Sequence, residues 1–333
     1  MNKSSRHIQQ AGFTLVELMV SMAIGLLIVL ALITLLINVN RNNSEMSKTN
    51  RQIENGRFAI QMLENDLIHA GFWGPLRPAA PTAIPDACLA GASWDTDPAY
   101  KPNMLAIPVL GFDSSSIPTS CTGVTGAQAN SDVLMVRHAN TCIAGSPNCD
   151  GGADTGPHIQ VSNCRIGAPP ESEYLIGPAS TLVEVAAFDL RNRSCVLTDI
   201  AERRKVVSNI YYVSNNTLMR VPLVNGIYQT TQPMIEGIAV MRIEYGVDSD
   251  ANGSADSYVS CAPCTLVQLA NIVAVKIHVL ARNLEATPGY TDSKSYQLGA
   301  TAPIVAANDG FKRHVYSTTV RLVNPSGRRE LPP

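Results

Sequence analysis

The sequence has few aromatic residues, no long run of charge of either sign and no cysteine before residue 88. Aromatic residues make up 5% and charged residues 16% of the 333 positions, and the formal net charge is −2. Nucleic-acid-binding proteins usually carry a basic patch that neutralises phosphates. Because this chain has only scattered Lys and Arg, we expect no nucleic-acid partner.

Motifs of the common enzyme classes are also missing. The chain contains no phosphate-binding P-loop and no GxGxxG, HExxH or GxSxG pattern. Its six histidines are scattered, and spacing alone supports no catalytic set of Ser, His and Asp. We therefore expect that the protein is not an enzyme, and that His278, in an alternating run, is a packed or solvent-facing residue.

One long apolar run contrasts with the rest of the chain, which is rich in Gly, Pro, Ser, Thr and Asn. Residues Leu18 to Ile37 carry no charge, and about 20 apolar residues allow a helix to cross a bilayer. A basic stretch with Lys3 and Arg6 precedes this run and should stay on the cytoplasmic side. The run therefore predicts a single membrane-spanning helix.

The residues before the apolar run do not fit an ordinary secretory signal, in which cleavage follows the apolar core. Gly12-Phe13-Thr14-Leu15-Val16-Glu17 instead resembles the cleavage and methylation motif of type IV prepilins. The resemblance implies that a prepilin peptidase cuts after Gly12, that Phe13 becomes the N-methylated first residue, and that Glu17 acts in assembly. The apolar helix is then retained in the mature chain.

Glu17 also has a physical argument of its own. An ionised carboxylate inside hydrocarbon costs a few kcal/mol unless it finds a partner. The new α-amino group of Phe13, on the same or a neighbouring subunit, is such a partner. In the pilin family, Glu at this place neutralises a neighbour's N-terminus. The alternative is a Glu at the membrane interface whose side chain reaches water.

The helical pattern continues beyond the membrane. No proline occurs between Phe13 and Trp73, and apolar residues recur at spacings of three and four from Ile53 to Leu67. We expect one helix to about Ala70, whose second half packs its apolar stripe, including Phe58 and Met62, on a soluble domain. Gly56 inside this helix costs about 1 kcal/mol relative to Ala. It indicates either a bend, a close approach of another helix, or simple tolerance.

Most of the remaining pattern is of the β type. Residues 206–213 and 218–221, joined by Ser214-Asn215-Asn216, predict a hairpin. Further strands are predicted at 132–137, 181–185, 234–245, 272–280 and 315–323. Four or more antiparallel strands would form a sheet with one face for the long helix.

Both ends of the chain resemble the PilW family of minor pilins. The resemblance lies in residues 52–74 and in three closing segments, EGIAVMRIEYGVD, NIVAVKIHVLARN and HVYSTTVRLVN. Ile68 stands where Arg is common, and Pro75 where Cys is expected, so the disulfide pattern should differ from that of relatives. The resemblance implies a pilin-like lollipop of the α+β class: a long N-terminal helix packed on an antiparallel β-sheet, with a Cys-rich loop insertion.

These observations predict a division of the chain into five parts. The parts are a cleaved leader (1–12), a transmembrane half-helix (13–37), an extracytoplasmic half-helix (38–71), an irregular disulfide-tied region (72–200) and a β-sheet region (201–333).

All cysteines follow the apolar segment, and their even number fits disulfides in an oxidising compartment. They are Cys88, Cys121, Cys142, Cys149, Cys164, Cys195, Cys261 and Cys264. On the order of 100 pairings are conceivable, and the neighbours Cys142/Cys149 and Cys261/Cys264 are the simplest local pairs. A zinc site at Cys261-Ala-Pro-Cys264 would need a second ligand pair, and none has a suitable spacing.

Residues 248–256, with the sequence DSDANGSAD, follow the first part of a calcium-loop pattern. The closing Glu of an EF-hand is absent, and no flanking helix is expected, so an EF-hand is excluded. Two interpretations stay open: a small Ca²⁺ site on a turn between strands, or an acidic turn whose side chains cap their own backbone. Ca²⁺ is the one candidate cofactor, and its predicted ligands are Asp248, Asp250, Asn252 and Asp256.

The resemblance implies a minor pilin that joins other minor pilins and the major pilin, through the N-terminal helix, in a complex that primes type IV pilus assembly at or near the tip. It implies a PilY-type tip adhesin as a further partner, with roles in adhesion and twitching motility. The protein would first span the inner membrane of a Gram-negative bacterium once, and then enter a periplasmic or extracellular pilus. The alternatives are a pseudopilin of a type II secretion system and an unprocessed single-span receptor.

Overall fold

The computed structural model describes Gly12 and residues 14–147, 149, 156–164, 172–178, 188–261, 264–305 and 308–330. The chain forms two compact units, Met1–Asn50 and Arg51–Pro333, and each is described by itself. Phe13, the predicted leader up to residue 11 and the strand predicted at 181–185 lie outside the described residues.

The first unit contains the apolar part of helix α1 (Leu15–His69). Every described side chain from residue 14 to residue 44 is exposed. This part of α1 is long and apolar enough to cross a membrane, and none of its apolar window is buried inside the protein. An exposed apolar surface of this extent is typical of a site that contacts a membrane or another protein.

In the second unit, the rest of α1 buries one stripe of residues at spacings of three and four: Gln52, Gly56, Ala59, Leu63 and Leu67. The predicted stripe is confirmed at Ala59, Leu63 and Leu67 and wrong at its edges, because Ile53 and Phe58 are exposed. Gln52 is buried in place of Ile53. Its Nε2 donates to the carbonyl oxygens of Ala281 and Lys312, each at 2.9 Å, which satisfies the buried amide.

Gly56 marks a close approach, as one of the interpretations predicted, although the neighbour is a strand and not a helix. A Cβ at this position would lie 2.4, 2.5 and 2.9 Å from three ring atoms of Tyr316. Only glycine lets the ring lie directly on the helix backbone. The helix ends as predicted, because Gly71 adopts the left-handed region with φ +69° and its N–H donates to the carbonyl of Arg137 at 2.9 Å.

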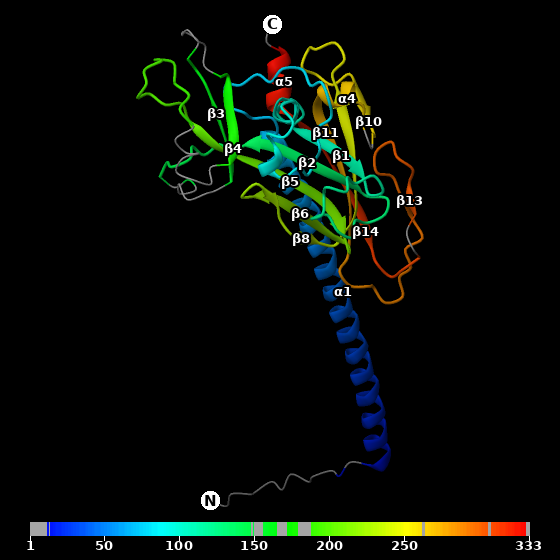
Figure 1. The fold of residues 1–333 in the computed structure, drawn as a ribbon. Coiled ribbons are helices and arrows are strands. Elements are labelled where there is room, and N and C mark those ends of the chain that lie inside the picture. Colours follow the sequence, from blue (N-terminus) through cyan, green and yellow to red (C-terminus); the bar gives the residue numbers. More distant parts are fainter. Residues whose placement is uncertain are drawn as a thin grey trace, which may run out of the picture. The chain divides into compact units, whose positions relative to one another are not determined.

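Two antiparallel sheets share the core of the second unit (Figure 1). In the first, β5 pairs with β2, β3 and β6. The strands of the first sheet are β1 (Val109–Asp113), β2 (Asp132–Ala139), β3 (Pro157–Val161), β4 (Tyr174–Pro178), β5 (Arg203–Ser214), β6 (Thr217–Val224), β7 (Ile227–Tyr228) and β8 (Gln232–Glu236). The second has the order β10-β9-β11-β14, and its strands are β9 (Ile238–Val247), β10 (Ser257–Val259), β11 (Ile272–Arg282) and β14 (Arg313–Arg321).

The described residues of the second unit also form smaller elements. Strands β12 (Ser295–Tyr296) and β13 (Ile304–Val305) form a separate pair, and the short helices are η1 (Gly91–Ser93), α2 (Tyr100–Ala106), α4 (Leu266–Ala270) and α5 (Val323–Glu330).

The two large sheets meet where β2 begins. There the Asp132 carboxylate accepts from the N–H of Ile243 and from Arg242 Nη1, each at 2.8 Å. One continuous core includes Ala59, Leu63 and Leu67 of α1 and side chains of both sheets.

The predicted hairpin is confirmed as β5 and β6. Asn215 and Asn216 form its two-residue loop with φ values of 47° and 56°, and Ser214 pairs with Thr217. Positive φ at both central residues is the type I′ turn that suits twisted strands. The strands predicted at 132–137 and 272–280 are confirmed as β2 and β11.

Two predicted strands have the wrong bounds. The strand expected at 234–245 is divided into β8 and β9 by Gly237, whose φ of +77° interrupts the extended backbone. The strand expected at 315–323 ends at Arg321, and Val323 begins helix α5. Helix α5 was not predicted because Pro325 and Gly327, which both disfavour helices, lie within it.

The region from 72 to 200, expected to be irregular, also contributes β1 to β4 to the first sheet. All eight residues of β2 are buried. A strand covered on both faces lacks the alternation by which strands are usually recognised. Its neighbours along the chain are tied by disulfides and also pack a second apolar core that includes Trp73, Trp94 and Tyr100.

Candidate functional site

The predicted processing motif begins helix α1 through a capping box. The backbone N–H and the hydroxyl of Thr14 donate to Glu17 Oε2 at 3.0 and 2.8 Å. In return, Thr14 Oγ1 accepts from the N–H of Glu17 at 3.3 Å. Such a reciprocal pair satisfies two amide groups that the first turn of a helix leaves without a partner.

The same contacts define what Glu17 can do chemically. Its side chain is exposed, and Thr14 is the only described residue that donates a hydrogen bond to it. A carboxylate accepts hydrogen bonds at four lone-pair positions, so Glu17 can receive an ammonium group without releasing Thr14. Gly12 is also exposed, while Phe13 lies outside the described residues. The capping role of Thr14 was not predicted from the sequence, although the spacing T-x-x-E is the sequence signal of a capping box.

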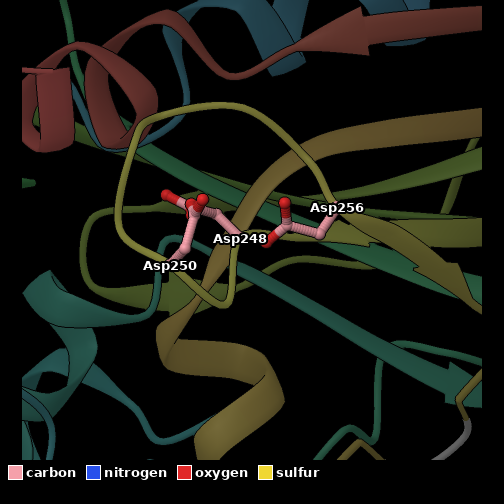
Figure 2. A group of neighbouring side chains, drawn as sticks. All are labelled: Asp248, Asp250 and Asp256. Atoms are coloured by element: carbon pink, nitrogen blue, oxygen red, sulfur yellow. The ribbon is translucent and has the colours of Figure 1, made fainter.

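The residues of the predicted calcium loop lie between β9 and β10 (Figure 2). One oxygen from each of Asp248, Asp250 and Asp256 lies within 4.8 Å of the others. Asn252 is engaged differently, because its Nδ2 donates to Asp250 at 2.9 Å and its Oδ1 accepts from the N–H of Ser254 at 2.7 Å. The structure therefore brings the three carboxylates together and ties Asn252 into the turn.

Backbone groups already satisfy much of this acidic loop. Asp248 accepts from the N–H groups of Asn252 and Gly253 at 3.2 and 2.9 Å. Asp256 accepts from the N–H and the hydroxyl of Ser249 at 2.7 and 2.6 Å. Arg329 lies 3.4 Å from Asp248 as an ion pair. A bound cation would have to compete with Arg329 for this carboxylate, which favours weak binding.

The electrostatics agree with these contacts. Burial alone would raise the pKa of Asp248, but the N–H of Gly253 and the charge of Arg329 outweigh it and hold that pKa below its usual value. The hydroxyl and N–H of Ser249 lower the pKa of Asp256. Both carboxyl groups are therefore ionised at neutral pH.

Helix α5 connects this loop to the end of α1. Ser326 Oγ donates to the carbonyl of Gly253 at 2.5 Å, and Asn324 Nδ2 donates to the carbonyls of His69 and Ala70 at 3.4 and 3.2 Å. The last carbonyls of a helix lack partners within it. Asn324 thus acts as a tertiary cap for α1, contributed from more than 250 positions along the chain.

All eight cysteines form disulfides: Cys88–Cys121, Cys142–Cys149, Cys164–Cys195 and Cys261–Cys264. The two local pairs are those that the spacing suggested. Because Cys261 and Cys264 are bonded to each other, they are not zinc ligands.

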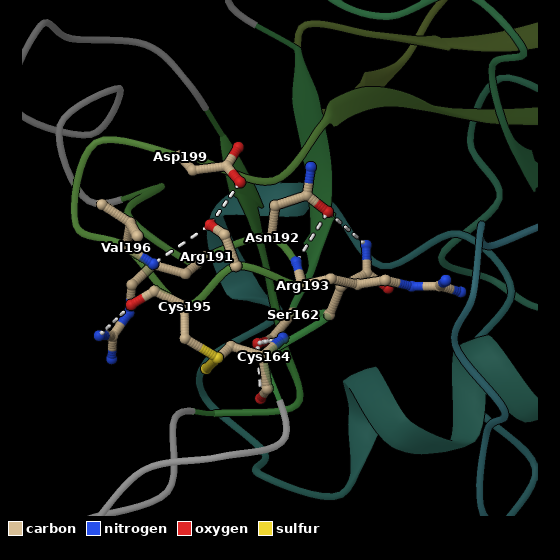
Figure 3. The surroundings of a disulfide bond; sticks show 10 residues. Ser162, Cys164, Arg191, Asn192, Arg193, Cys195, Val196 and Asp199 are labelled. Carbon is tan, nitrogen blue, oxygen red and sulfur yellow. Dashed lines mark hydrogen bonds between the residues drawn. A yellow bond between two sulfur atoms is a disulfide. The ribbon is translucent and has the colours of Figure 1, made fainter.

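The Cys164–Cys195 disulfide joins the residues that follow β3 to the loop 191–199 (Figure 3). Arg191 Nη1 donates to the carbonyl of Cys195 at 3.2 Å, and Ser194 Oγ donates to Asp199 at 2.5 Å. These contacts hold the loop closed while the Leu197 side chain at its tip is 80% exposed. The loop 191–199 is therefore a closed turn that presents Leu197 to its surroundings.

Comparisons with known proteins match the two ends of the chain. The family described as type IV pilus-assembly protein W matches residues 209–324, and the prokaryotic N-terminal methylation motif matches residues 8–36. The resemblance predicted from the closing strands and from the processing motif is thereby confirmed. No curated protein matches the chain at a significant level.

Two solved structures are similar to the chain at low identity. A type IV-like pilin from Thermus thermophilus is 14% identical with a TM-score of 0.38, over 82% of this chain and 96% of that one. A chain of the GspK-GspI-GspJ complex from the type 2 secretion system of enterotoxigenic Escherichia coli is 11% identical with a TM-score of 0.28, over 80% and 96%. Neither TM-score reaches 0.5.

Proposed function

We propose, from a prepilin-type N-terminus combined with a region that matches the PilW family, that this chain is a minor pilin. A prepilin peptidase cuts it after Gly12 and Phe13 is N-methylated. It then joins other minor pilins and the major pilin in a complex that primes type IV pilus assembly at or near the tip. The observation that carries the proposal is the fully exposed apolar stretch of α1, which only lipid or neighbouring helices can cover.

In this proposal, Glu17 selects the position at which a new subunit enters. An unpaired carboxylate in the hydrocarbon layer costs a few kcal/mol. Pairing with the α-ammonium of a neighbour's Phe13 removes that cost only when the two helices stand in the correct axial position. The capping contacts with Thr14 leave the carboxylate able to accept this partner.

The capping box allows charge and helix capping to be tested separately. Gln at the third helical position preserves a capping box, so Glu17→Gln removes the charge and keeps the cap. Thr14→Ala removes the cap and keeps the charge. Immunoblots of sheared pili and of inner membranes should show Glu17→Gln in membranes but at least about tenfold depleted from pili. Losing the charge pair should cost a few kcal/mol, and each loss of about 1.4 kcal/mol reduces incorporation about tenfold. Thr14→Ala should be incorporated.

Normal incorporation of Glu17→Gln would reject charge pairing. Loss of Thr14→Ala from pili together with normal incorporation of Glu17→Gln would show that helix capping, and not charge, controls entry.

Two other functions remain distinguishable by experiment. An unprocessed single-span receptor would keep its full mass when expressed with prepilin peptidase, whereas a pilin or pseudopilin would lose the 12 residues up to Gly12. A deletion strain separates the remaining pair. Loss of pili, twitching motility and adhesion supports the minor pilin, and co-purification with a PilY-type adhesin supports the tip complex. Loss of secretion with normal pili supports a pseudopilin of a type II secretion system.

A further inference from the structure

A cavity of about 460 Å³ opens beside helix α5 in the second unit. Most of its wall is apolar, formed by prolines, alanines and the side chains of Leu269, Ile272 and Leu322. Three arginines line the same cavity: Arg77, Arg328 and Arg329. No Asp or Glu occurs among its described lining residues. A cavity of this size lies in the range typical of small-ligand sites.

Backbone carbonyls hold two of the guanidinium groups at the cavity wall. Arg328 Nη1 donates to the carbonyl of Gly71 at 2.9 Å. Arg329 Nη2 donates to the carbonyl of Ala270 at 2.8 Å and to Asn271 Oδ1 at 2.5 Å. These bonds use part of the five N–H donors that each guanidinium carries. Arg329 Nη1 also donates to Asp248 at 3.4 Å. The donors that then remain on the two guanidinium groups have no hydrogen-bond partner among the described residues.

The third arginine is free to move. Arg77 is exposed and makes no hydrogen bond or ion pair with a described residue. Arg77 lies shortly after the end of α1 in the chain, far in sequence from Arg328 and Arg329, and lines the same cavity. An arginine in this situation can close onto a ligand at little cost, because no existing bond must break.

The positive charge of the cavity is not balanced. Among the carboxylates that the structure describes, only Asp248 pairs with one of the three arginines, and it lies 3.4 Å from Arg329. Burial, with the nearby charges of Arg77 and Arg329, lowers the pKa of Arg328 to about 10. Three like charges with one counter-ion repel one another, so an additional anion would stabilise the folded unit.

We propose that this cavity binds a carboxylate attached to a short apolar body, with the arginines holding the carboxylate and the proline- and leucine-lined wall receiving the carbon chain. Guanidinium groups pair with carboxylates through two parallel hydrogen bonds. Arg329 already attracts one carboxylate of the chain, because its Nη1 lies 3.4 Å from Asp248 Oδ2. Both a free organic acid and the carboxyl end of a peptide present this chemistry.

Thermal unfolding of the full chain in detergent tests the site. Both tryptophans are buried in the second unit, so their fluorescence reports its unfolding. The probes are acetate, valerate, the peptide acetyl-Ala-Ala-Val with a free carboxyl end and its amide, all against chloride at equal ionic strength. We expect valerate or the peptide to raise the Tm in a saturable manner, the amide to have no effect, and acetate to bind more weakly than valerate. Tighter binding of valerate would identify a free organic acid as the ligand, and tighter binding of the peptide would identify the carboxyl end of a peptide.

Arg77→Gln should weaken binding by about tenfold or more, the size expected for a lost charged hydrogen bond, and should leave the unliganded Tm nearly unchanged. Arg51→Gln is the matched control, because it makes the same charge change at an exposed residue outside the cavity. Arg77→Glu should raise the Tm without a ligand and abolish the response, since it supplies a carboxylate internally.

The proposal is overturned by any of three results: no probe raises the Tm above chloride, the amide acts as well as the free peptide, or Arg77→Gln responds like the wild type. If acetate binds as tightly as valerate, the apolar wall takes no part in recognition, and that half of the proposal is wrong.

Discussion

The contact between Gly56 and Tyr316 predicts that alanine at position 56 destabilises the second unit, although alanine favours helices. In an exposed helix interior, replacing Gly by Ala gains about 1 kcal/mol. Here the new Cβ would lie 2.4 to 2.9 Å from three ring atoms of Tyr316, whereas carbon atoms in contact are normally about 3.5–4.0 Å apart. The ring would have to move by about 1 Å to restore that spacing.

The ring has little room for this movement. His314 packs against it at a centroid distance of 4.8 Å, and the ring belongs to the partly buried shell of the main core. Overpacking a well-filled site costs about 1–3 kcal/mol. This cost exceeds the gain in helix propensity, so we expect Gly56→Ala to lose about 1 kcal/mol of unfolding free energy.

A double-mutant cycle measures the effect cleanly. Urea unfolding of the full chain in detergent, followed by the fluorescence of the buried Trp73 and Trp94, gives the free energy of each variant. In the Tyr316→Ala background the clash is absent, and Gly56→Ala should instead stabilise by about 1 kcal/mol. The sign therefore reverses between backgrounds, with a coupling of about 2 kcal/mol. If Gly56→Ala stabilises the protein while Tyr316 is present, the close-packing explanation is wrong.

Three further predictions follow from the N-terminus, the acidic loop and the buried carboxylates. Gly12→Trp should block cleavage by its bulk, so that mass spectrometry finds the uncut chain; a mature-length product would exclude Gly12 as the residue before the cut. Calorimetry should show weak Ca²⁺ binding at millimolar concentration that strengthens in Arg329→Gln, since Arg329 competes for Asp248; no heat in either protein would leave the loop as a simple acidic turn. Stability should fall as the pH drops from about 4 to 2; unchanged stability over this range would contradict the proposed hydrogen-bond network.

The direction in which stability changes with pH follows from the direction of the pKa shifts of the buried carboxyl groups. Burial would raise the pKa of Asp292, but hydrogen bonds from Arg313 and Tyr296 lower it below the usual value. The pKa of Asp248 is lowered as well. A carboxyl group with a lowered folded-state pKa contributes stability above its unfolded-state pKa, and this contribution is lost as the pH falls through the folded-state pKa.

The features that the sequence alone determined are those whose physical cause lies within a few residues. The apolar run of α1 is defined by composition, the processing motif by adjacent residues, and the hairpin by two asparagines that tolerate positive φ. The capping box of Thr14 and Glu17 was missed, although its signal, T-x-x-E, also spans only one helical turn. Each could be recognised without knowing what the segment packs against.

Other features required the tertiary structure, since their partners lie far away in the chain. Periodicity predicted a buried face on α1 but not its limits, which depend on Gln52 meeting carbonyls of the second sheet and on Tyr316 covering Gly56. The pairing of Cys88 with Cys121 and of Cys164 with Cys195 spans 33 and 31 positions. The arginine cavity combines residue 77 with residues 328 and 329. Local patterns repeat every two or 3.6 residues and contain no information about such distant contacts, so only the folded chain decides them.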